Sequence, residues 1–376
     1  MLTMRWREAL VAIAAIFLVS RGALVLIALF LENNIPLAYH GPTYASGSLL
    51  TSLTGSDSVY LLGIAAEGYH ASPVHEAFRD WAFFPLYPIV TRAVSVLTLG
   101  NVAVAGVLVS NVAFVGALAV LYALTVRHLD HDRAVRSLAF VALAPGAVAF
   151  AMAYTDSLFL LLAAGAFLAA EQRRWALMAL LYGLASLTRL QGVLLGIPLA
   201  ILIAESSGGW RTAAAWRTPR LLWLAAGPIG LGMFAAYLAW AFGDPLGMFT
   251  AQQAWSNIGR PSTGNTTPVL ANTDAIVLLL VGVLAYYAFL LAFLRWDRLK
   301  AAYVALGLVM FGATFASMFF NATLLQSSAR YLAVVWPFAW ALANRRGPTF
   351  QLVGLAGFAA LFGIYGMLNF TQALAP

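Results

Sequence analysis

The stretch SLTGSDSVYLLGIAAEGYHASPVHEAFRDWAFFPLYPIVTR, residues 52–92, lies between hydrophobic segments and differs from them in character. It holds four acidic residues, two histidines and the dense run FFPLYP. Charged groups are costly beside a lipid bilayer, so a polar interval of this length between apolar spans indicates a function. We interpret it as the active-site loop of a membrane enzyme.

The composition of the whole chain supports a membrane location. Hydrophobic residues make up 62% of its 376 residues, and charged residues make up 9%. Soluble domains average about 45–50% apolar and about 25% charged residues, so a water-soluble fold is excluded. The net charge of +7 is explained better by basic cytoplasmic loops than by a nucleic-acid partner. The absence of cysteine excludes disulfides and thiolate chemistry.

Hydrophobic runs predict an all-α, polytopic membrane protein. A helix needs about 20 apolar residues to cross about 30 Å of hydrocarbon. We expect a single membrane domain over residues 1–376, with extracytoplasmic loops at about 32–101 and 243–273. The eleven predicted spans are 9–31, 102–126, 136–153, 157–171, 175–188, 191–204, 221–242, 275–294, 301–320, 331–343 and 349–369.

The basic residues predict a cytoplasmic N-terminus and an extracytoplasmic C-terminus, because with this parity most of them lie inside. Arg21 falls within the first span, and the outer residues are Arg79, Arg92, Arg189, Arg260 and Arg330. The same rule favours a break in 175–204 near Thr188–Gly192, which makes two short spans. Prolines and Arg92 predict that residues 83–100 form a juxtamembrane helix and not a further span.

Two aspartates have both a functional and a structural interpretation. Asp57 follows Gly55-Ser56 and begins an apolar helical stretch, so it is a candidate base or a helix cap. Asp156 ends a span and begins the next helix, where capping is the simpler interpretation. The turn Glu67-Gly68-Tyr69-His70 brings three polar side chains to the same compartment as Asp57.

The outer arginines are candidates for anion binding, because the planar guanidinium matches phosphate oxygens. Arg330, followed by Tyr331, opens a short span, although a basic residue there can also snorkel to lipid headgroups. Arg21 inside the first span is a functional candidate by default, with an acidic loop residue as its expected partner. The histidines lack a metal-ligand spacing, so we predict no metal site.

These pieces together resemble the PIG-V-like mannosyltransferases, membrane enzymes of the GT-C glycosyltransferase fold class. The resemblance rests on short motifs that occur in family order over most of the chain. They are SDSVYLLGIAAEGY (56–69), AFFPLYPIV (82–90), YTDSLF (154–159), TRLQG (188–192), GDPLGMFTAQQAW (243–255) and RYLAVVWPF (330–338).

The resemblance implies an inverting transfer of mannose from a polyprenyl-phosphate donor to a lipid-linked acceptor at the extracytoplasmic face. It implies a GT-C-like bundle, no cofactor, and location in the cell membrane of a prokaryote or the endoplasmic reticulum of a eukaryote. The family's loop aspartate falls on Asp57, which is therefore the expected catalytic base. The expected substrate-binding residues are Glu67, Tyr69, His70, Asp156, Arg189, Gln191, Gln253, Arg330, Tyr331 and Arg21.

Two other functions remain open from the residues alone. A transporter or lipid flippase typically has ionisable groups at mid-membrane and repeated halves. Here the acidic residues lie at span ends or in loops, and no repeat is evident. A non-catalytic membrane scaffold would leave the outer Asp and Arg residues unexplained. The acceptor, the linkage and the choice of mannose over another hexose are not specified by the sequence.

Overall fold

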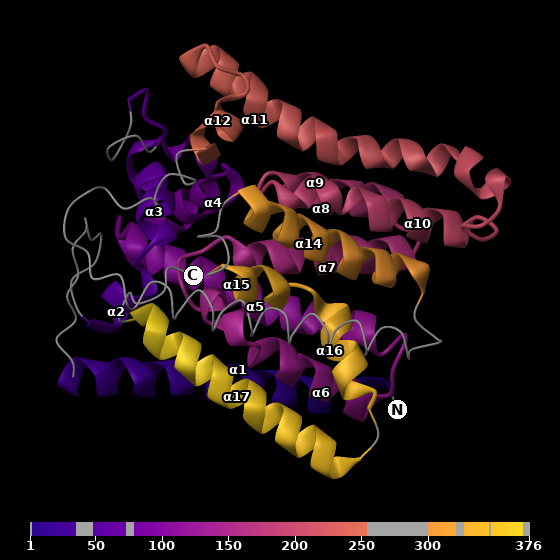
Figure 1. Ribbon diagram of the computed structural model, residues 1–376, viewed down its shortest axis with the longest axis horizontal. Helices are drawn as coiled ribbons and strands as arrows, with labels where there is room; N and C mark the ends of the chain where they lie inside the picture. Colours follow the sequence, from indigo (N-terminus) through magenta and orange to yellow (C-terminus); the bar gives the residue numbers. More distant parts are fainter. Residues whose placement is uncertain are drawn as a thin grey trace.

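The computed structural model describes residues 2–34, 48–72, 79–253, 300–320, 327–345 and 347–370, and these form helices without any strand (Figure 1). The all-α prediction is therefore confirmed for this part of the chain. The elements are α1 (Leu2–Asn34), α2 (Ser48–Leu53), α3 (Asp57–Glu67), η1 (Asp80–Ala82), α4 (Leu86–Ser95), η2 (Val96–Thr98), α5 (Val102–Thr125), α6 (His131–Ala142), η3 (Pro145–Phe150), α7 (Asp156–Glu171), α8 (Trp175–Ser186), α9 (Gln191–Leu194), α10 (Gly196–Ser206), η4 (Ala213–Arg217), η5 (Pro219–Ala225), α11 (Ala226–Phe242), α12 (Gly247–Gln253), α14 (Ala301–Phe320), α15 (Ser328–Ala333), α16 (Trp336–Ala343) and α17 (Pro348–Phe370).

Among the described residues, four helices are long and apolar enough to cross a membrane. They are Arg5–Asn34, Val102–Thr125, Pro219–Phe242 and Pro348–Phe370. Many of their large apolar side chains are exposed on the protein surface, and Trp240 on α11 is 85% exposed. A lipid bilayer solvates such an apolar surface, whereas water does not. The chain is therefore an integral membrane protein. The total of eleven spans stays a prediction, and the one at 275–294 lies outside the described residues.

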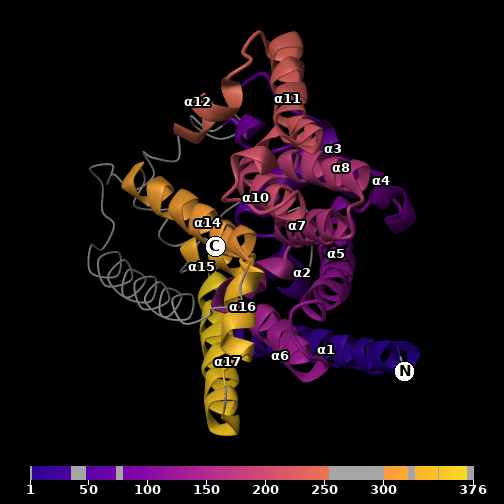
Figure 2. The ribbon, with the colours of Figure 1, turned by 90° about the vertical axis from the view of Figure 1, so that its right-hand side faces the viewer.

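The helices are arranged in a bundle with α5 and α7 in its middle. In both views α11 lies at one edge, and α1, α6 and α17 lie together at the other (Figures 1 and 2). The core is formed by the apolar helices α5 and α7, which pack side by side along most of their length. Small alanine side chains on these two helices allow the close approach.

Loops that the basic residues assign to one side of the membrane do meet at one end of this bundle. Glu171, at the end of α7, accepts hydrogen bonds from Arg127 Nε at 2.8 Å, Lys300 Nζ at 2.9 Å and Tyr303 Oη at 2.9 Å. Arg127 and Lys300 come from two other loop regions predicted to be cytoplasmic, and Tyr303 lies in the first turn of α14. The loops predicted for one side of the membrane therefore lie at one end of the bundle. Which end faces the cytoplasm stays a prediction.

The predicted span at 136–153 is wrong as a continuous helix. Helix α6 ends at Ala142, and the chain continues through the short 3-10 helix η3 to the start of α7. Pro145 lacks a backbone N–H and cannot continue an α-helix, which explains the break. The 12 residues of α6 rise about 18 Å, too little to cross about 30 Å of hydrocarbon.

The buried backbone after η3 is satisfied by polar side chains, as irregular backbone in a membrane protein requires. The Phe150 carbonyl accepts from Arg21 Nη2 and Ser157 Oγ, both at 3.0 Å. The Ala151 carbonyl accepts from Asn111 Nδ2 at 3.2 Å. These bonds fix the segment that carries Tyr154 and Asp156.

Arg21 therefore has a different partner from the acidic residue that we expected. Its Nε donates to Asn111 Oδ1 at 2.7 Å, and its guanidinium carbon lies 4.4 Å from the centre of the Phe114 ring. Aromatic faces attract such a cation in an apolar setting. Among the described residues no carboxylate pairs with Arg21, so its visible role is to hold the helix break.

The chain breaks near Thr188–Gly192, as the basic residues predicted. Helix α8 ends at Ser186, and α9 and α10 fold back along it, with Tyr182 Oη donating to the Val193 carbonyl at 2.7 Å. An added Cβ at Gly192 would lie 2.3 Å from the Ala185 carbonyl oxygen, so only glycine permits this approach. The turn presents Arg189 and Gln191 together.

Residues 86–98 form the short helix predicted for 83–100, as α4 followed by η2. Its C-terminal end exposes the apolar side chains of Val96, Leu97 and Leu99. Such a tip suits the boundary between lipid headgroups and acyl chains. Its inner face buries Tyr87, whose hydroxyl donates to the Gly106 carbonyl of α5 at 2.8 Å.

Candidate active site

Four charged residues from distant parts of the sequence meet at the end of the bundle where α3 and α7 begin. We call Asp57, Asp156, Arg189 and Arg330 the Asp–Arg cluster. Arg330 Nη1 donates to Asp57 Oδ2 at 2.7 Å, and its Nε donates to Asp156 Oδ2 at 2.8 Å. Arg189 Nη1 donates to the other oxygen of Asp156. One arginine therefore bridges two carboxylates, and one carboxylate holds two arginines.

The members of the Asp–Arg cluster differ in how exposed their side chains are, and this difference indicates which of them a substrate can reach. The side chain of Asp156 is 0% exposed and that of Arg330 is 6% exposed, whereas that of Asp57 is 23% exposed. Two positive and two negative charges cancel, which makes burial of the group tolerable. Asp57 is thus the carboxylate that a substrate can reach, and Asp156 lies behind it.

Helix capping does not account for either aspartate. The N-cap residues of α3 and α7 are Ser56 and Thr155, and each aspartate is the first residue of its helix. Both oxygens of Asp156 accept hydrogen bonds from arginines, so the capping interpretation of Asp156 is wrong. For Asp57, the bond to Arg330 takes the place that a capping bond would have.

The backbone just before Asp57 is strained. Ser56 has φ 52° and ψ −127°, a region that residues other than glycine rarely adopt. Such conformations cost about 1–3 kcal/mol and cluster at functional sites, where the surrounding structure holds them. The conformation turns the chain directly into α3 and places the Asp57 carboxylate against Arg330.

Aromatic rings surround the two arginines of the cluster. The guanidinium carbon of Arg330 lies 4.2 Å from the centre of the Tyr154 ring, and that of Arg189 lies 5.0 Å from the centre of the Tyr331 ring. Stacking on an aromatic face orients a guanidinium without using its N–H donors. Tyr154 was missed as a site residue by sequence reasoning, and its place next to Thr155-Asp156 was the available signal.

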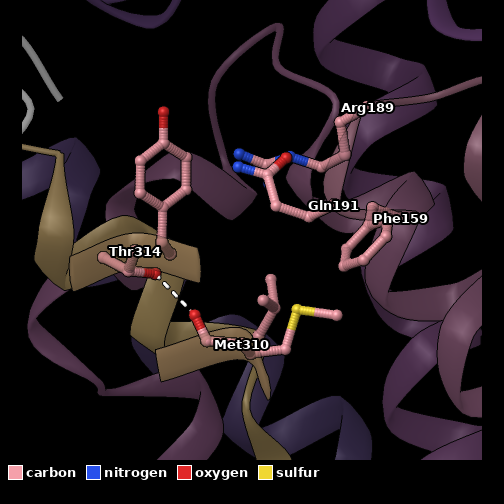
Figure 3. A pocket seen from close by; sticks show the side chains of 7 residues that line it. Phe159, Arg189, Gln191, Met310 and Thr314 are labelled. Atoms are coloured by element: carbon pink, nitrogen blue, oxygen red, sulfur yellow. Dashed lines mark hydrogen bonds between the residues drawn. The ribbon is translucent and has the colours of Figure 1, made fainter. Parts of the chain in front are cut away.

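A pocket adjoins the cluster on the side of α14 (Figure 3). Arg189 and Gln191 lie on one side of it, and Met310 and Thr314 of α14 lie on the other. The lining is completed by Phe159, Tyr331 and Val334. Apolar walls with a few convergent polar groups are typical of small-molecule sites. Three predicted binding residues, Arg189, Gln191 and Tyr331, thus line one pocket.

The remaining predicted loop residues form a separate group at the other end of α3. Glu67 is ten residues after Asp57, which corresponds to about 15 Å along the helix axis. His70 Nδ1 lies 2.9 Å from Asp80 Oδ2, and its Nε2 lies 3.1 Å from Glu67 Oε2. Tyr69 Oη donates to the Phe83 carbonyl at 2.7 Å. These three residues therefore organise the loop and do not touch the Asp–Arg cluster.

Hydrogen bonding and burial shift the pKa values of His70 and Asp80 in opposite directions. The hydrogen bond that His70 donates to the Asp80 carboxylate is the main cause that raises the pKa of His70 above its ordinary value of 6.5. Burial raises the pKa of the Asp80 carboxyl. The raised pKa of His70 adds stability to the loop below the ordinary histidine pKa, and this stability is lost as pH rises through the raised pKa of His70.

Gln253 is the last residue of α12, and its side chain lies outside the described residues. Helix α12 packs on η1, where an added Cβ on Gly247 would lie 2.5 Å from the Trp81 ring. The same tryptophan donates from Nε1 to the His70 carbonyl at 2.8 Å. Within the described ranges, no three His, Asp or Glu side chains are grouped as metal ligands.

Gly146 controls the position of Arg330, because η3 packs directly on the backbone of α15. A Cβ on Gly146 would lie 2.2 Å from the Ala329 carbonyl and 2.3 Å from the Arg330 nitrogen. We expect Gly146→Ala to lower the midpoint of thermal unfolding in detergent, since overpacking costs about 1–3 kcal/mol. We also expect it to lower activity by displacing Arg330.

The matched control for this substitution is Gly232→Ala on α11, where an added Cβ meets nothing within 4 Å. Alanine there should leave the unfolding midpoint unchanged or raise it slightly, because alanine favours helix. Equal midpoints for the two variants would show that α15 moves aside without cost and that Gly146 does not set the Arg330 position.

Comparison with known proteins agrees with the motifs. Residues 35–201 match the family described as Mannosyltransferase (PIG-V), a range that includes Asp57, Asp156 and Arg189. No curated protein sequence matches the chain.

Among solved structures, the chain is similar to the oligosaccharyltransferase of Archaeoglobus fulgidus tethered with an acceptor peptide. The identity is 14%, the coverage 94% of this chain and 55% of that one, and the TM-score 0.44. It is also similar to the AglB oligosaccharyltransferase of Archaeoglobus fulgidus in complex with an inhibitory peptide and a dolichol-phosphate. Here the identity is 12%, the coverage 96% and 55%, and the TM-score 0.49. The chain thus spans about half the length of these structures. Residues 35–201, somewhat less than half of the chain, are thus similar to the PIG-V mannosyltransferases.

Proposed function

We propose that this enzyme transfers mannose from a polyprenyl-phosphate donor to a lipid-linked acceptor at the extracytoplasmic face of the membrane. The observation that carries the proposal is the contact between Asp57 and Arg330, a carboxylate and a guanidinium 2.7 Å apart at the partly exposed edge of a buried cluster. A glycosyl transfer from a lipid phosphate needs one group of each kind. The choice of mannose as the sugar rests on the family match of residues 35–201. The choice of lipid-linked donor and acceptor rests on the resemblance of the sequence motifs to the same family.

Asp57 acts as the general base in this proposal. Its carboxylate accepts the proton of the acceptor hydroxyl while the acceptor oxygen attacks the anomeric carbon of the donor. Arg330 hydrogen-bonds one carboxylate oxygen, Oδ2, and the acceptor hydroxyl approaches the other, Oδ1. Attack opposite to the departing phosphate inverts the anomeric carbon in a single displacement.

The arginines stabilise the departing lipid phosphate. Arg330 and Arg189 are held side by side by Asp156, and Arg189 also lines the adjoining pocket with Gln191. Two guanidinium groups neutralise the phosphate oxygens as negative charge develops on them, so the proposal includes no metal or other cofactor. The membrane helices, in a GT-C-like bundle, allow the lipid donor to enter from the side.

The direct test is transfer of radiolabelled mannose from a polyprenyl-phosphate donor by the detergent-solubilised protein, across a panel of lipid acceptors. We expect labelled product with the mannosyl donor and much less with the corresponding glucosyl donor. Product from a nucleotide sugar but not from the lipid phosphate would contradict the proposed donor. Absence of transfer to every acceptor, with ATP- or gradient-driven lipid movement instead, would favour a flippase.

A further inference from the structure

Arg330 contacts the proposed base and a buried anchor at the same time. Its Nε donates to Asp156 at 2.8 Å, and its Nη1 donates to Asp57 at 2.7 Å. Asp156 is fully buried and is also held by Arg189, whereas Asp57 is 23% exposed. The bond to Asp156 is therefore enclosed by protein, and the bond to Asp57 lies where substrates arrive.

The reaction under the proposed function moves a negative charge across this arginine. The acceptor proton goes to Asp57, and the acceptor oxygen forms a bond to the anomeric carbon. The bond from that carbon to the phosphate oxygen breaks, and its electron pair stays on the phosphate. Asp57 thereby becomes neutral while the phosphate changes from a singly charged diester to a doubly charged monoester. The total charge of the site is unchanged.

We infer that Arg330 is a shared counterion, which exchanges Asp57 for the leaving phosphate as the proton is transferred. A hydrogen bond to an ionised partner is roughly twice as strong as one between neutral groups. Protonation of Asp57 therefore weakens its bond to Nη1 at the step at which the phosphate gains charge. Because Asp156 retains Nε, the guanidinium can change partners without leaving the site.

This exchange links the two halves of the reaction. In the resting enzyme the positive charge of Arg330 is shared with two carboxylates, so a bound donor phosphate receives only part of it. A larger part becomes available as the acceptor is deprotonated, so the stabilisation by Arg330 is greater in the transition state than in the ground state. Without a correctly placed acceptor, Asp57 stays charged and the lipid phosphate gains no additional stabilisation as it leaves.

The inference predicts opposite effects of one substitution on catalysis and on product binding. Asp57→Asn has nearly the shape of the protonated aspartic acid and carries no charge, so it releases Arg330 in advance. Turnover should fall, yet the variant should bind a phosphate monoester more tightly. We expect the Kd of a short isoprenyl phosphate such as citronellyl phosphate to fall about tenfold or more, since Arg330 gains a charge-assisted bond.

The measurement is binding of citronellyl phosphate to the purified protein in detergent at pH 8, where the monoester is a dianion. The methyl diester of the same compound carries a single charge and stands in for the donor. Its affinity should rise less than that of the monoester. Asp132→Asn is the matched control, because Asp132 is an exposed carboxylate in the first turn of α6, outside the Asp–Arg cluster. This control should leave both affinities unchanged.

A double variant distinguishes the role of Arg330 from a direct effect of the lost Asp57 charge on the bound phosphate. In an Arg330→Gln background, Asp57→Asn should no longer tighten binding, and thermal unfolding shows whether this protein is folded. Unchanged or weaker monoester binding by Asp57→Asn, or equal tightening by Asp132→Asn, would overturn the exchange while leaving the proposed function standing. A wild-type protein that neither binds the monoester nor transfers mannose would overturn the proposed function itself.

Discussion

Replacing Asp57 by asparagine is expected to lower the turnover of mannosyl transfer by about 10²–10⁴-fold, the usual contribution of a positioned general base. Asparagine keeps the shape and one acceptor for the bond from Arg330, but it cannot take the acceptor proton. Donor binding and the midpoint of thermal unfolding should change little, because Asp57 is partly exposed and Asp156 still pairs with Arg330. The measurement is initial rate at saturating donor and acceptor.

The control for this variant is again Asp132→Asn, at an exposed aspartate in the first turn of α6 and outside the Asp–Arg cluster. It makes the same chemical change away from the cluster and should keep turnover within about a few-fold of wild type. If Asp57 served only to stabilise the start of α3, Asp57→Asn would stay active, since asparagine is as good as aspartate at a helix N-terminus. Turnover near wild type in this variant would therefore disprove the base assignment and direct the search to other carboxylates of the loop.

The helices themselves were largely predictable from hydrophobic length. The predicted spans at 102–126, 301–320 and 349–369 agree with α5, α14 and α17 to within two residues at each end. The reason is physical, because a bilayer of fixed thickness requires a long apolar run wherever a helix crosses it. The break at Thr188–Gly192 was found differently, from the sidedness of arginines in the neighbouring loops.

The break at η3 shows where such reasoning fails. Residues 136–153 are apolar enough to suggest a span, and only Pro145-Gly146 indicates otherwise. The irregular backbone is tolerated because Arg21, Asn111 and Ser157 hydrogen-bond its carbonyl groups from other positions in the chain. A hydrophobicity pattern contains no information about such long-range partners, so we expected an acidic partner for Arg21, and none of the described carboxylates pairs with it.

The members of the candidate site were predictable as residues, but their arrangement was not. Outer aspartates and arginines were conspicuous because charge is rare near these spans. That Arg330 lies between Asp57 and Asp156, 273 and 174 positions away, follows from helix packing and from the bare backbone at Gly146. Conversely, Glu67, Tyr69 and His70 were grouped with Asp57 by sequence and lie at the opposite end of α3. Residues that are near each other in sequence were expected to share one site, but the length of α3 keeps them apart.

Arg330→Ala is the second substitution with a large expected effect. Losing a charge-assisted hydrogen bond to the donor phosphate costs about 1.5–3 kcal/mol, roughly 10- to 150-fold in affinity. The structure adds a second consequence. With alanine at position 330, Asp156 keeps Arg189 as its single arginine partner, and no arginine among the described residues pairs with Asp57. Breaking a buried ion pair costs about 3–5 kcal/mol, so the unfolding midpoint should fall as well.

The conservative variant separates these two consequences. Lysine keeps the positive charge, but its single ammonium lacks the planar fork with which Arg330 contacts both aspartates. Arg330→Lys should therefore recover part of the stability and only a small part of the donor affinity. The measurements are thermal unfolding in detergent and the Kd of a polyprenyl-phosphate donor for each variant.

Arg92→Ala is the matched control, because Arg92 is an exposed arginine on α4 that is also predicted to lie on the outer side. If outer arginines acted only by anchoring to lipid headgroups, both alanine variants would retain donor affinity. A side chain that is 6% exposed and paired with two carboxylates is poorly placed for a headgroup anchor. Donor affinity unchanged in a folded Arg330→Ala protein would mean that the phosphate is held elsewhere, with Arg189 in the adjoining pocket as the next arginine to replace.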